Sequence, residues 1–106
     1  MAALPDVLAR CTGFEWDDGN AAKNWTLHRV AQTESEQVFF SRPVLVAADA
    51  RHSGQEARYA ALGRTTAGRW LAVVFTIRGT LIRVISARDM SRRERRVYEG
   101  ARQGGE

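Results

Sequence analysis

Short apolar segments separated by turn residues run through the second half of the chain, and this pattern predicts a sheet. Four segments read as strands: VLVAADA (44–50), RYAALGRT (58–65), WLAVVFTIR (70–78) and LIRVISAR (81–88). Turn residues separate them at Ser53-Gly54, Thr66-Ala67-Gly68 and Arg78-Gly79-Thr80. Such short links force antiparallel neighbours, because a parallel crossover needs a dozen or more residues. The segment 70–78 is apolar on both faces, so we expect it in the centre of the sheet, with helices covering one side.

The first half of the chain carries helical signals instead. FEWD (14–17) reads as a short strand closed by a turn, and residues 20–29 have a helix-forming composition. Thr33 and Glu36 fit a capping box, which predicts a short helix that ends before Pro43. The whole pattern is typical of an α+β domain: two N-terminal helices packed on an antiparallel meander, followed by a C-terminal helix.

The last helix is predicted to begin at Ser91, because Ser91 and Glu94 form a second capping box. At 100° per residue, Val97, Tyr98 and Ala101 gather on one arc. Arginines cover the rest of the helix: Arg92, Arg93, Arg95, Arg96 and Arg102. Two interpretations stay open: the solvated charged face of a docked helix, or a basic surface that faces phosphate or an acidic partner protein.

Charge is distributed unevenly between the two halves of the chain. Residues 1–50 carry four basic and seven acidic side chains, whereas residues 51–106 carry twelve and five. Fifteen of the sixteen basic residues are arginine, whose planar fork grips phosphate in bidentate fashion and stacks on bases. The arginine bias of a GC-rich genome is an alternative source of this excess. The basic half indicates an anionic partner, with nucleic acid as the first candidate and an acidic protein as the second.

A chain of 106 residues is long enough for one hydrophobic core. We expect residues 1–13 to be an N-terminal extension and residues 14–106 to form a single domain. No apolar run approaches the ~20 residues that span a bilayer, and the first residues lack the features of a signal peptide. The single cysteine, Cys11, allows no internal disulfide, so we expect a cytoplasmic protein.

Several catalytic motifs are absent, which narrows the chemistry. His28 and His52 lack partner cysteines or a regular metal-binding spacing, and the sequence has no P-loop, dinucleotide fingerprint or nucleophile elbow. We therefore expect no metal and no other cofactor. The remaining residue types suit cleavage of RNA by its own 2′-hydroxyl, because the substrate supplies the nucleophile. Arginines would stabilise charge on the phosphate, a histidine or glutamate would move protons, and an aromatic ring would hold an unstacked base.

Arg83 stands in an otherwise apolar strand, where a charge needs a partner or a function. An ion pair with Glu56 is the structural alternative. Glu56 and Arg58 share one face if their strand begins by Glu56. Arg88 is five positions after Arg83, so a regular strand puts the two on opposite faces. They join one site only if the strand bends or ends before Arg88.

Two residues outside these strands complete the candidates. Trp16 would stack a base, and its structural alternative is a core tryptophan. His28 is a second candidate for proton transfer beside Glu56, and its structural alternative is an ordinary histidine on a helix face.

These motifs occur together, in the same order, in one toxin family. The resemblance is carried by FEWD at 14–17, Lys23-Asn24 followed by His28, RHS at 51–53 with Glu56, Arg58 and Tyr59, Gly63, Gly68-Arg69 and IRVISARDMSRRERRVYE. The match runs from about Phe14 to Glu99, and the fragment R-x-I-S-A-R followed by E-R-x-x-Y is its most specific part. The chain thus resembles the BrnT family of type II toxins.

The resemblance implies a RelE-like ribonuclease fold and a metal-independent endoribonuclease that inhibits translation by cutting RNA. It also implies a BrnA-type antitoxin that neutralises the toxin and binds operator DNA, so that this chain would meet DNA only indirectly. A homodimer or a heterotetramer with the antitoxin is compatible with this expectation. The candidate catalytic residues are Glu56, Arg58, Arg83, Arg88 and His28. The candidate RNA-binding residues are Trp16, Lys23 and Ser86, and the candidate antitoxin-binding or basic helix comprises Arg92, Arg93, Arg95 and Arg96.

The chain departs from the family pattern at three places. Leu27 stands where the family usually has lysine, Ala57 stands where it often has a second glutamate, and residues 1–13 exceed the usual beginning. The first departure removes a phosphate contact. It favours the alternative function, a catalytically weakened or inactive member that acts as a non-catalytic antitoxin- or RNA-binding module.

Overall fold

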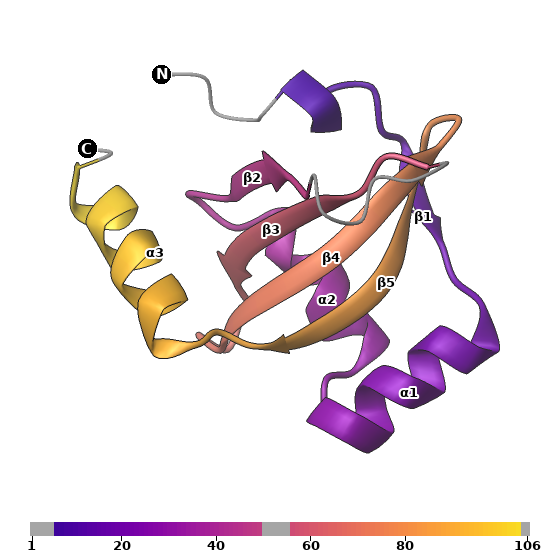
Figure 1. The fold of residues 1–106 in the computed structure, drawn as a ribbon, viewed down its shortest axis with the longest axis horizontal. Helices are drawn as coiled ribbons and strands as arrows, with labels where there is room; N and C mark the ends of the chain where they lie inside the picture. Colours follow the sequence, from indigo (N-terminus) through magenta and orange to yellow (C-terminus); the bar gives the residue numbers. More distant parts are fainter. Residues whose placement is uncertain (1–5, 50–55, 105–106) are drawn as a thin grey trace.

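The computed structural model describes residues 6–49 and 56–104, and over these ranges the chain folds into one sheet and three α-helices (Figure 1). In chain order the elements are η1 (Asp6–Leu8), β1 (Gly13–Glu15), α1 (Asp18–His28), α2 (Gln32–Val38), β2 (Leu45–Ala48), β3 (Tyr59–Arg64), β4 (Trp70–Arg78), β5 (Leu81–Asp89) and α3 (Arg92–Gly104). The predicted α+β class is confirmed. The turn expected at Ser53-Gly54 lies outside the described residues, as does His52. No helix in the described ranges is long and apolar enough to cross a bilayer.

The four strands predicted from the apolar pattern pair in sequence order. β2 pairs with β3, β3 with β4 and β4 with β5, and all three pairs are antiparallel, as the short links require. β4 has the central place in the strand order β1-β5-β4-β3-β2. Leu71, Val73 and Phe75 are buried on one face of β4, and Ala72 and Thr76 are buried on the other. The prediction of a central strand that is buried on both faces is confirmed.

The first strand corrects the prediction of a purely antiparallel meander. β1 pairs in parallel with β5, with Gly13 opposite Leu81 and Glu15 opposite Arg83, so the sheet is mixed. Short links predict the pairing of neighbouring strands only, and no short link joins β1 to β5. β1 and β5 are separated by two helices and three strands, which leave ample chain for a parallel arrangement.

α1 begins before the predicted residue 20 because Asp17 caps it. The Asp17 carboxylate accepts a hydrogen bond from the backbone N–H of Asn20 at 2.7 Å. The helix ends at Arg29, which adopts a left-handed conformation with φ of 54°. Its N–H donates to the carbonyl of Trp25 at 2.9 Å and thereby closes the last turn.

The start of α2 corrects the predicted capping box. The helix begins one residue before Thr33, and Glu34 rather than Glu36 accepts a hydrogen bond from the N–H of Ala31, at 2.9 Å. Glu36 accepts a hydrogen bond from the indole N–H of Trp16 at 2.8 Å instead. The capping box therefore lies two positions earlier than predicted, and Glu36 makes a tertiary contact in place of the cap.

The core forms between one face of the sheet and α2 with the segments that flank it; α2 lies behind the sheet in Figure 1, whereas α1 lies at the edge of the sheet beside β5, which corrects the prediction that both helices pack on the sheet. Val30, Val38 and Phe39 come from the helical layer, and Phe75 and Val84 come from the sheet. The ring of Phe39 meets the ring of Phe75 edge-on, with 5.0 Å between their centroids. Among the described residues, no helix covers the central part of the opposite face, which we call the open face.

α3 starts as the second capping box predicts. Ser91 donates its backbone N–H to the Glu94 carboxylate at 2.8 Å, and the Ser91 hydroxyl accepts the N–H of Glu94 at 3.2 Å. The helix stands at one end of the sheet (Figure 1).

Tyr98 anchors α3 to the sheet. Its buried ring packs edge-on against Trp70 at 5.0 Å, and its hydroxyl donates to the Pro43 carbonyl at 2.6 Å. Val97 was expected on the same buried arc, but it is 54 % exposed. The prediction was wrong because the helix contacts only the end of the sheet and buries Tyr98 alone.

Candidate active site

A bulge in β5 places three candidate residues on one face of the sheet. The partners of Arg83, Ser86 and Arg88 on β4 are, in order, Thr76, Val74 and Ala72. These partners alternate regularly along β4, so they share one face, and the residues opposite them share it too. The register shifts between Val84 and Ser86 and leaves Ile85 as the extra residue of the bulge. The bulge is the bend that a shared site for Arg83 and Arg88 requires.

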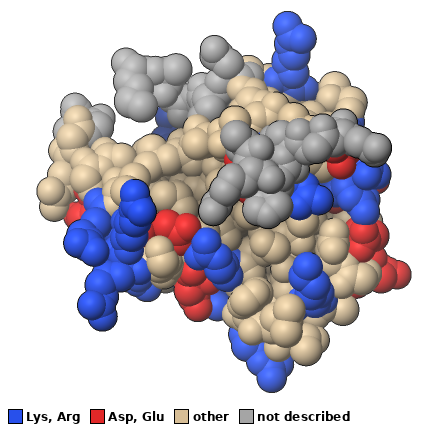
Figure 2. Space-filling model, in the orientation of Figure 1, with Lys and Arg blue, Asp and Glu red and all other residues tan. Residues whose placement is uncertain are grey.

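These three residues lie on the open face. Its floor consists of small and medium apolar side chains, among them Ala60, Leu62 and Val74. Arg58 directly precedes β3, and its carbonyl continues the ladder to β2 by accepting the N–H of Asp49 at 2.8 Å. By alternation Arg58 lies on the same face as Ala60. Figure 2 shows this face, with basic side chains gathered over α3 and others beside acidic side chains.

Two asparagines of α1 hold the bulge from the side. Asn20 donates its amide N–H to the Val84 carbonyl at 3.3 Å, and the backbone N–H of Ala87 donates to Oδ1 of Asn24 at 3.2 Å. Both contacts lie on the edge of β5 beyond Arg83, where the pairing with β1 ends. Unpaired backbone groups are costly to bury, so the two side chains take the place of a further strand.

Arg83 is held by two carboxylates from the beginning of the chain. Its guanidinium lies 3.1 Å from the Glu15 carboxylate and also forms an ion pair with Asp17. The side chain is 19 % exposed, so most of it is removed from water and its charge is balanced within the fold. The ion pair with Glu56, which was the structural alternative for Arg83, does not form, because Glu56 pairs with Arg78. The parallel pairing of β1 with β5, which the sequence did not predict, places Glu15 opposite Arg83 instead.

Glu56 binds Arg78 at the end of β4, with 3.0 Å between the carboxylate and the guanidinium. Arg78 also lies 3.9 Å from Glu15, so Glu56 is linked to Arg83 only through a chain of alternating charges. The hydrogen bond from Arg78 to Glu56 is the main cause that raises the pKa of Arg78. Glu56 and Arg58 were expected to share a strand face if the strand began by Glu56. β3 begins at Tyr59, so this condition is not met.

Arg88 forms a bidentate pair with Glu94 at the start of α3, with distances of 2.7 and 2.9 Å. The hydrogen bond from Arg88 lowers the pKa of Glu94 to about 2; partial burial opposes this shift, and contacts with Ser91 add to it. The same bond raises the pKa of Arg88. Arginine uses this fork geometry for phosphate as well as carboxylate. Glu94 therefore occupies the donors that a substrate phosphate would use.

Three candidates have no side-chain hydrogen bond or ion pair to another described residue: Arg58, Lys23 and Ser86. Arg58 and Ser86 are partly buried on the open face, whereas Lys23 is exposed on α1. Lys23 directly precedes Asn24, the residue that contacts the edge of β5. Their donors are thus free of carboxylates from the described part of the chain.

His28 and Trp16 lie in different surroundings. His28 is exposed at the end of α1, and its carbonyl accepts a hydrogen bond from Arg69 at 3.0 Å. That arginine lowers the pKa of Asp89 at the end of β5, and the charge of His28 makes a smaller contribution of the same sign. Trp16 packs against the core, and its indole N–H is engaged by Glu36. The structure therefore brings His28 close to the end of β5 and gives Trp16 a structural contact.

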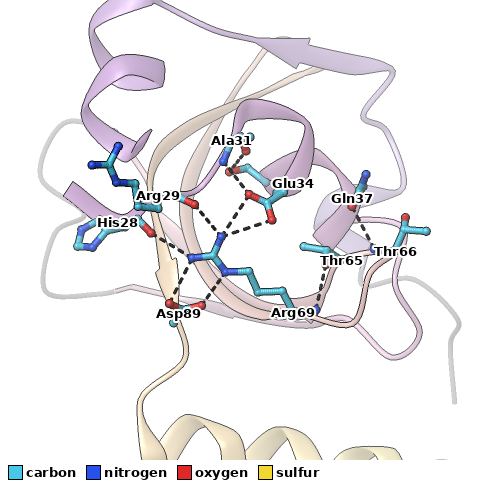
Figure 3. Close-up of polar contacts among 10 residues, drawn as sticks. His28, Arg29, Ala31, Glu34, Gln37, Thr65, Thr66, Arg69 and Asp89 are labelled. Carbon is cyan, nitrogen blue, oxygen red and sulfur yellow. Dashed lines mark hydrogen bonds and ion pairs between the residues drawn. The ribbon is translucent and has the colours of Figure 1, made fainter. Parts of the chain in front are cut away.

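Arg69, which was not among the predicted site residues, connects four elements (Figure 3). Its guanidinium donates to Asp89 at 2.8 and 3.2 Å, to Glu34 at 3.2 Å, and to the carbonyls of His28 and Arg29 at 3.0 and 2.7 Å. One cation thus joins the ends of α1 and β5 with the starts of α2 and β4. The bond to Asp89 raises the pKa of Arg69. The only signal in the sequence was the position of Arg69 after the turn glycine in the family motif.

The arginines of α3 divide into two groups. Arg95 and Arg102 place their guanidinium groups over the ring of Trp70, 5.8 and 5.5 Å from its centroid, and Arg102 also pairs with Glu99 at 3.1 Å. The others are exposed and have no ion pair with a described residue: Arg92, Arg93 and Arg96. The first group docks the helix, and the second forms a basic surface.

The open face carries guanidinium groups and one hydroxyl group along its length, and both kinds of group can bind an RNA backbone. The partners of Arg83 and Arg88 on β4 are four residues apart, which corresponds to about 13 Å along a strand. Two long arginine side chains can converge on one segment of RNA backbone over that distance. The described residues contain no group of three or more His, Cys, Asp or Glu side chains placed to hold a metal ion.

Comparison with known proteins gives the chain a family. A family model described as the ribonuclease toxin BrnT of a type II toxin–antitoxin system matches residues 16–94. The crystal structure of the Brucella abortus ribonuclease toxin BrnT has a similar fold, with a TM-score of 0.59 and 23 % identity. That likeness covers 76 % of this chain and 99 % of the Brucella chain. No curated protein matches. Since the family model spans most of its length, the chain belongs to the BrnT family of ribonuclease toxins of type II toxin–antitoxin systems.

Proposed function

We propose that this chain is a metal-independent endoribonuclease that cuts RNA on the open face by attack of the substrate 2′-hydroxyl. The observation that carries this proposal is the β5 bulge, which aligns Arg83, Ser86 and Arg88 on a face that no described helix covers at its centre. Arg58 lies on the same face, so the scissile phosphate would meet cations from two strands. A RelE-like mode of action, with inhibition of translation, is the finer reading of this proposal.

In this mechanism the 2′-oxygen bonds to phosphorus, the bond from phosphorus to the 5′-oxygen breaks, and the products are a 2′,3′-cyclic phosphate and a 5′-hydroxyl. One group accepts the proton of the 2′-hydroxyl and another gives a proton to the leaving 5′-oxygen. Arginines stabilise the charge that grows on the non-bridging oxygens. Arg83 is the central one, because it is preorganised by two carboxylates.

The two candidates for proton transfer lie toward opposite ends of the face. His28 is near the end of β5 that carries Arg88, and Glu56 is bound to Arg78 at the other end. His28 is exposed and its side chain has no hydrogen bond to a described residue, whereas Glu56 must first leave Arg78. This difference supports His28 as the group that moves a proton and Glu56 as a residue that orients arginine.

The antitoxin in this proposal is a BrnA-type protein that covers the toxin and mediates its contact with operator DNA. The exposed arginines of α3 support an acidic antitoxin segment as their partner: Arg92, Arg93 and Arg96. Their side chains are not neutralised by described carboxylates, which is what an intermolecular ion-pair surface requires.

The test compares wild type with Arg83→Ala on a labelled RNA in the presence of EDTA. We expect Arg83→Ala to lose about 10²–10³-fold in cleavage rate, as when one oxyanion donor is removed, and wild-type products to end in 2′,3′-cyclic phosphate. Arg10→Gln is the matched control, because it removes an exposed arginine that lies before the first strand in the sequence. Circular dichroism establishes that each variant is folded.

A second function, a non-catalytic antitoxin- or RNA-binding module, is favoured by two observations. Arg83 and Arg88 are both paired with carboxylates, and Leu27 is 63 % exposed at a position where the family usually has lysine. If wild type cuts no RNA, with or without ribosomes, yet binds its antitoxin, this module replaces the endoribonuclease. Growth arrest on expression, relieved by the antitoxin, supports the enzyme.

A further inference from the structure

A hollow of about 560 Å³ lies at the end of the sheet where β3 turns into β4. Its lining residues are Gln37, Phe40, Ser41, Arg42, Arg64, Thr65, Thr66 and Gly68. The volume falls within the roughly 300–1,000 Å³ of small-molecule sites. The lining contains two arginines, three hydroxyl groups, one amide and one aromatic ring, but no carboxylate. This composition suits an anionic ligand that also has a flat ring.

Phe40 supplies the aromatic surface. It is 76 % exposed, more than Trp25, Leu27 or Val97. Its ring meets the ring of Phe14 in a T-shaped contact, with 6.3 Å between their centroids, and most of the side chain is exposed to solvent. A single exposed apolar side chain is ordinary on a protein surface. Here it borders a hollow with two cations, and that combination points to a nucleobase and its phosphate.

The wall of the hollow is firmly built. The Ser41 hydroxyl accepts the N–H of Arg64 at 3.2 Å and donates to the Val38 carbonyl at 2.7 Å. A Cβ atom at Gly63 would lie 2.5 Å from that hydroxyl, so only glycine permits the close approach of β3 to the end of α2. Gln37 accepts the N–H of Thr66 at 3.0 Å and fixes the turn.

Arg64 connects the hollow to the open face. It alternates with Ala60 and Leu62 along β3, so its Cβ belongs to that face, while its guanidinium donates to the Arg42 carbonyl at 3.0 Å. The turn that follows Arg64 lies at the same end of the sheet as Arg88. α3 docks on Trp70, the partner of Arg64, at this end, so an RNA strand on the open face would pass α3 on its way to the hollow.

We propose that this hollow binds one nucleotide of single-stranded RNA outside the scissile step, with Phe40 stacking on the base and Arg42 and Arg64 binding phosphate. The proposal rests on the proposed function in taking RNA as the ligand. It also gives the base-stacking role to Phe40. Trp16, which was expected to stack a base, instead hydrogen-bonds Glu36 and packs against the core. The polar lining favours a nucleotide over an antitoxin helix, which would need a continuous apolar groove.

The experiment measures affinity without cleavage, using full-length protein and 2′-O-methylated RNA in fluorescence anisotropy. We expect Phe40→Ala to weaken binding of a long RNA by about tenfold, equivalent to ~1.4 kcal/mol, and Phe40→Trp to restore it. Arg42→Gln is expected to weaken the same RNA and to lower the salt dependence. A short RNA that covers only the open face is expected to bind wild type and Phe40→Ala equally.

Leu27→Ala is the matched control, because it removes another exposed apolar side chain outside the hollow. Wild-type affinity of Phe40→Ala for the long RNA would overturn the proposal. A loss of antitoxin binding without a loss of RNA binding would also overturn it and assign the hollow to the protein partner. Failure of the endoribonuclease proposal shows separately, as the absence of RNA cleavage by wild type with or without ribosomes.

Discussion

At the scale of single residues, the arginines of the open face differ in how their charges are balanced. Arg83 has two carboxylates, Arg88 has one in bidentate geometry, and Arg58 has none among the described residues. A phosphate can bind Arg58 without displacing a described group, whereas at Arg88 it must compete with Glu94. The cost of opening that pair therefore makes the free energy of RNA binding less favourable.

The Arg88–Glu94 pair predicts a specific response to acid. Its formation holds the pKa of Glu94 at about 2, against 4.5 for the free side chain. The stabilisation is complete above about pH 4.5 and is lost as the pH falls toward 2, because the unfolded chain takes up the proton first. We expect the free energy of unfolding to fall less steeply over this window in Glu94→Gln than in wild type.

Urea unfolding at several pH values across the window measures this difference. Glu99→Gln is the matched control, since it removes a carboxylate from the same helix without contacting Arg88. Identical slopes for wild type and Glu94→Gln would show that the pair is absent in solution.

At the scale of elements, the bulge in β5 depends on a helix that lies beside it. Asn20 and Asn24 satisfy a carbonyl and an N–H on either side of the extra residue, Ile85. Asn24 is 1 % exposed, so water cannot replace its contact with the strand. The alignment of Arg83 with Arg88 therefore relies on α1 as well as on the sheet.

Asn24→Ala is expected to destabilise the protein by ~1–3 kcal/mol, because the buried N–H of Ala87 loses its acceptor. It is also expected to speed amide exchange at Ala87 and to lower kcat more than KM changes, since the bulge no longer holds Arg88. Hydrogen exchange and steady-state cleavage measure these effects, with Thr26→Ala on the exposed side of the same helix as control. A stability loss with unchanged kcat would leave Asn24 a purely structural role.

The sequence predicted the elements whose evidence is local. Strands β3, β4 and β5 and the cap of α3 follow from alternation, turn residues and one S-x-x-E motif. It did not predict the pairing of β1 with β5, because no local signal records which distant edge a short strand joins. The partners of Arg83 were missed for that reason: Glu15 and Asp17 reach it only through this pairing.

The candidate site residues stay a prediction, and their arrangement did not follow from the sequence. The motif resemblance supplied Arg58, Arg83, Ser86 and Arg88. The spacing of Arg83 and Arg88 indicated that the two can share a face only if their strand bends or ends between them. The bulge itself has no sequence signal here, because Ile85 is an ordinary strand residue. Arg69 had a place in the motif, yet its role depends on carbonyls of α1 that only the tertiary fold brings near.

At the scale of the whole molecule, the two halves of the chain differ in charge, and the fold brings them into contact. Carboxylates of the acidic half, Glu15, Asp17 and Glu34, bind Arg83 and Arg69 of the basic half. Part of the sequence asymmetry is thus neutralised inside the fold. The remaining positive charge lies on α3 and on the arginines that have no described partner.

Salt dependence of RNA binding measures how much of this charge contacts phosphate. For a single strand, the logarithm of the binding constant falls with the logarithm of salt concentration by ~0.7 per phosphate contact. We expect Arg58→Gln to reduce the slope by about that amount and Arg10→Gln to leave it unchanged. Arg96→Gln decides the role of α3: an unchanged slope supports an antitoxin surface, and a reduced slope supports an RNA contact. An Arg58→Gln slope equal to wild type would contradict phosphate binding by Arg58.

The parallel pairing of β1 with β5 has a consequence for synthesis. The first strand has no edge to join until the strand that carries Arg83 has been made, 66 and 68 positions after Asp17 and Glu15. A nascent chain that lacks its last quarter cannot form the ion pairs that orient Arg83, nor the bulge that aligns it with Arg88. If Arg83 acts as proposed, the protein would stay inactive during its own translation, and a truncated product released from the ribosome would lack the site.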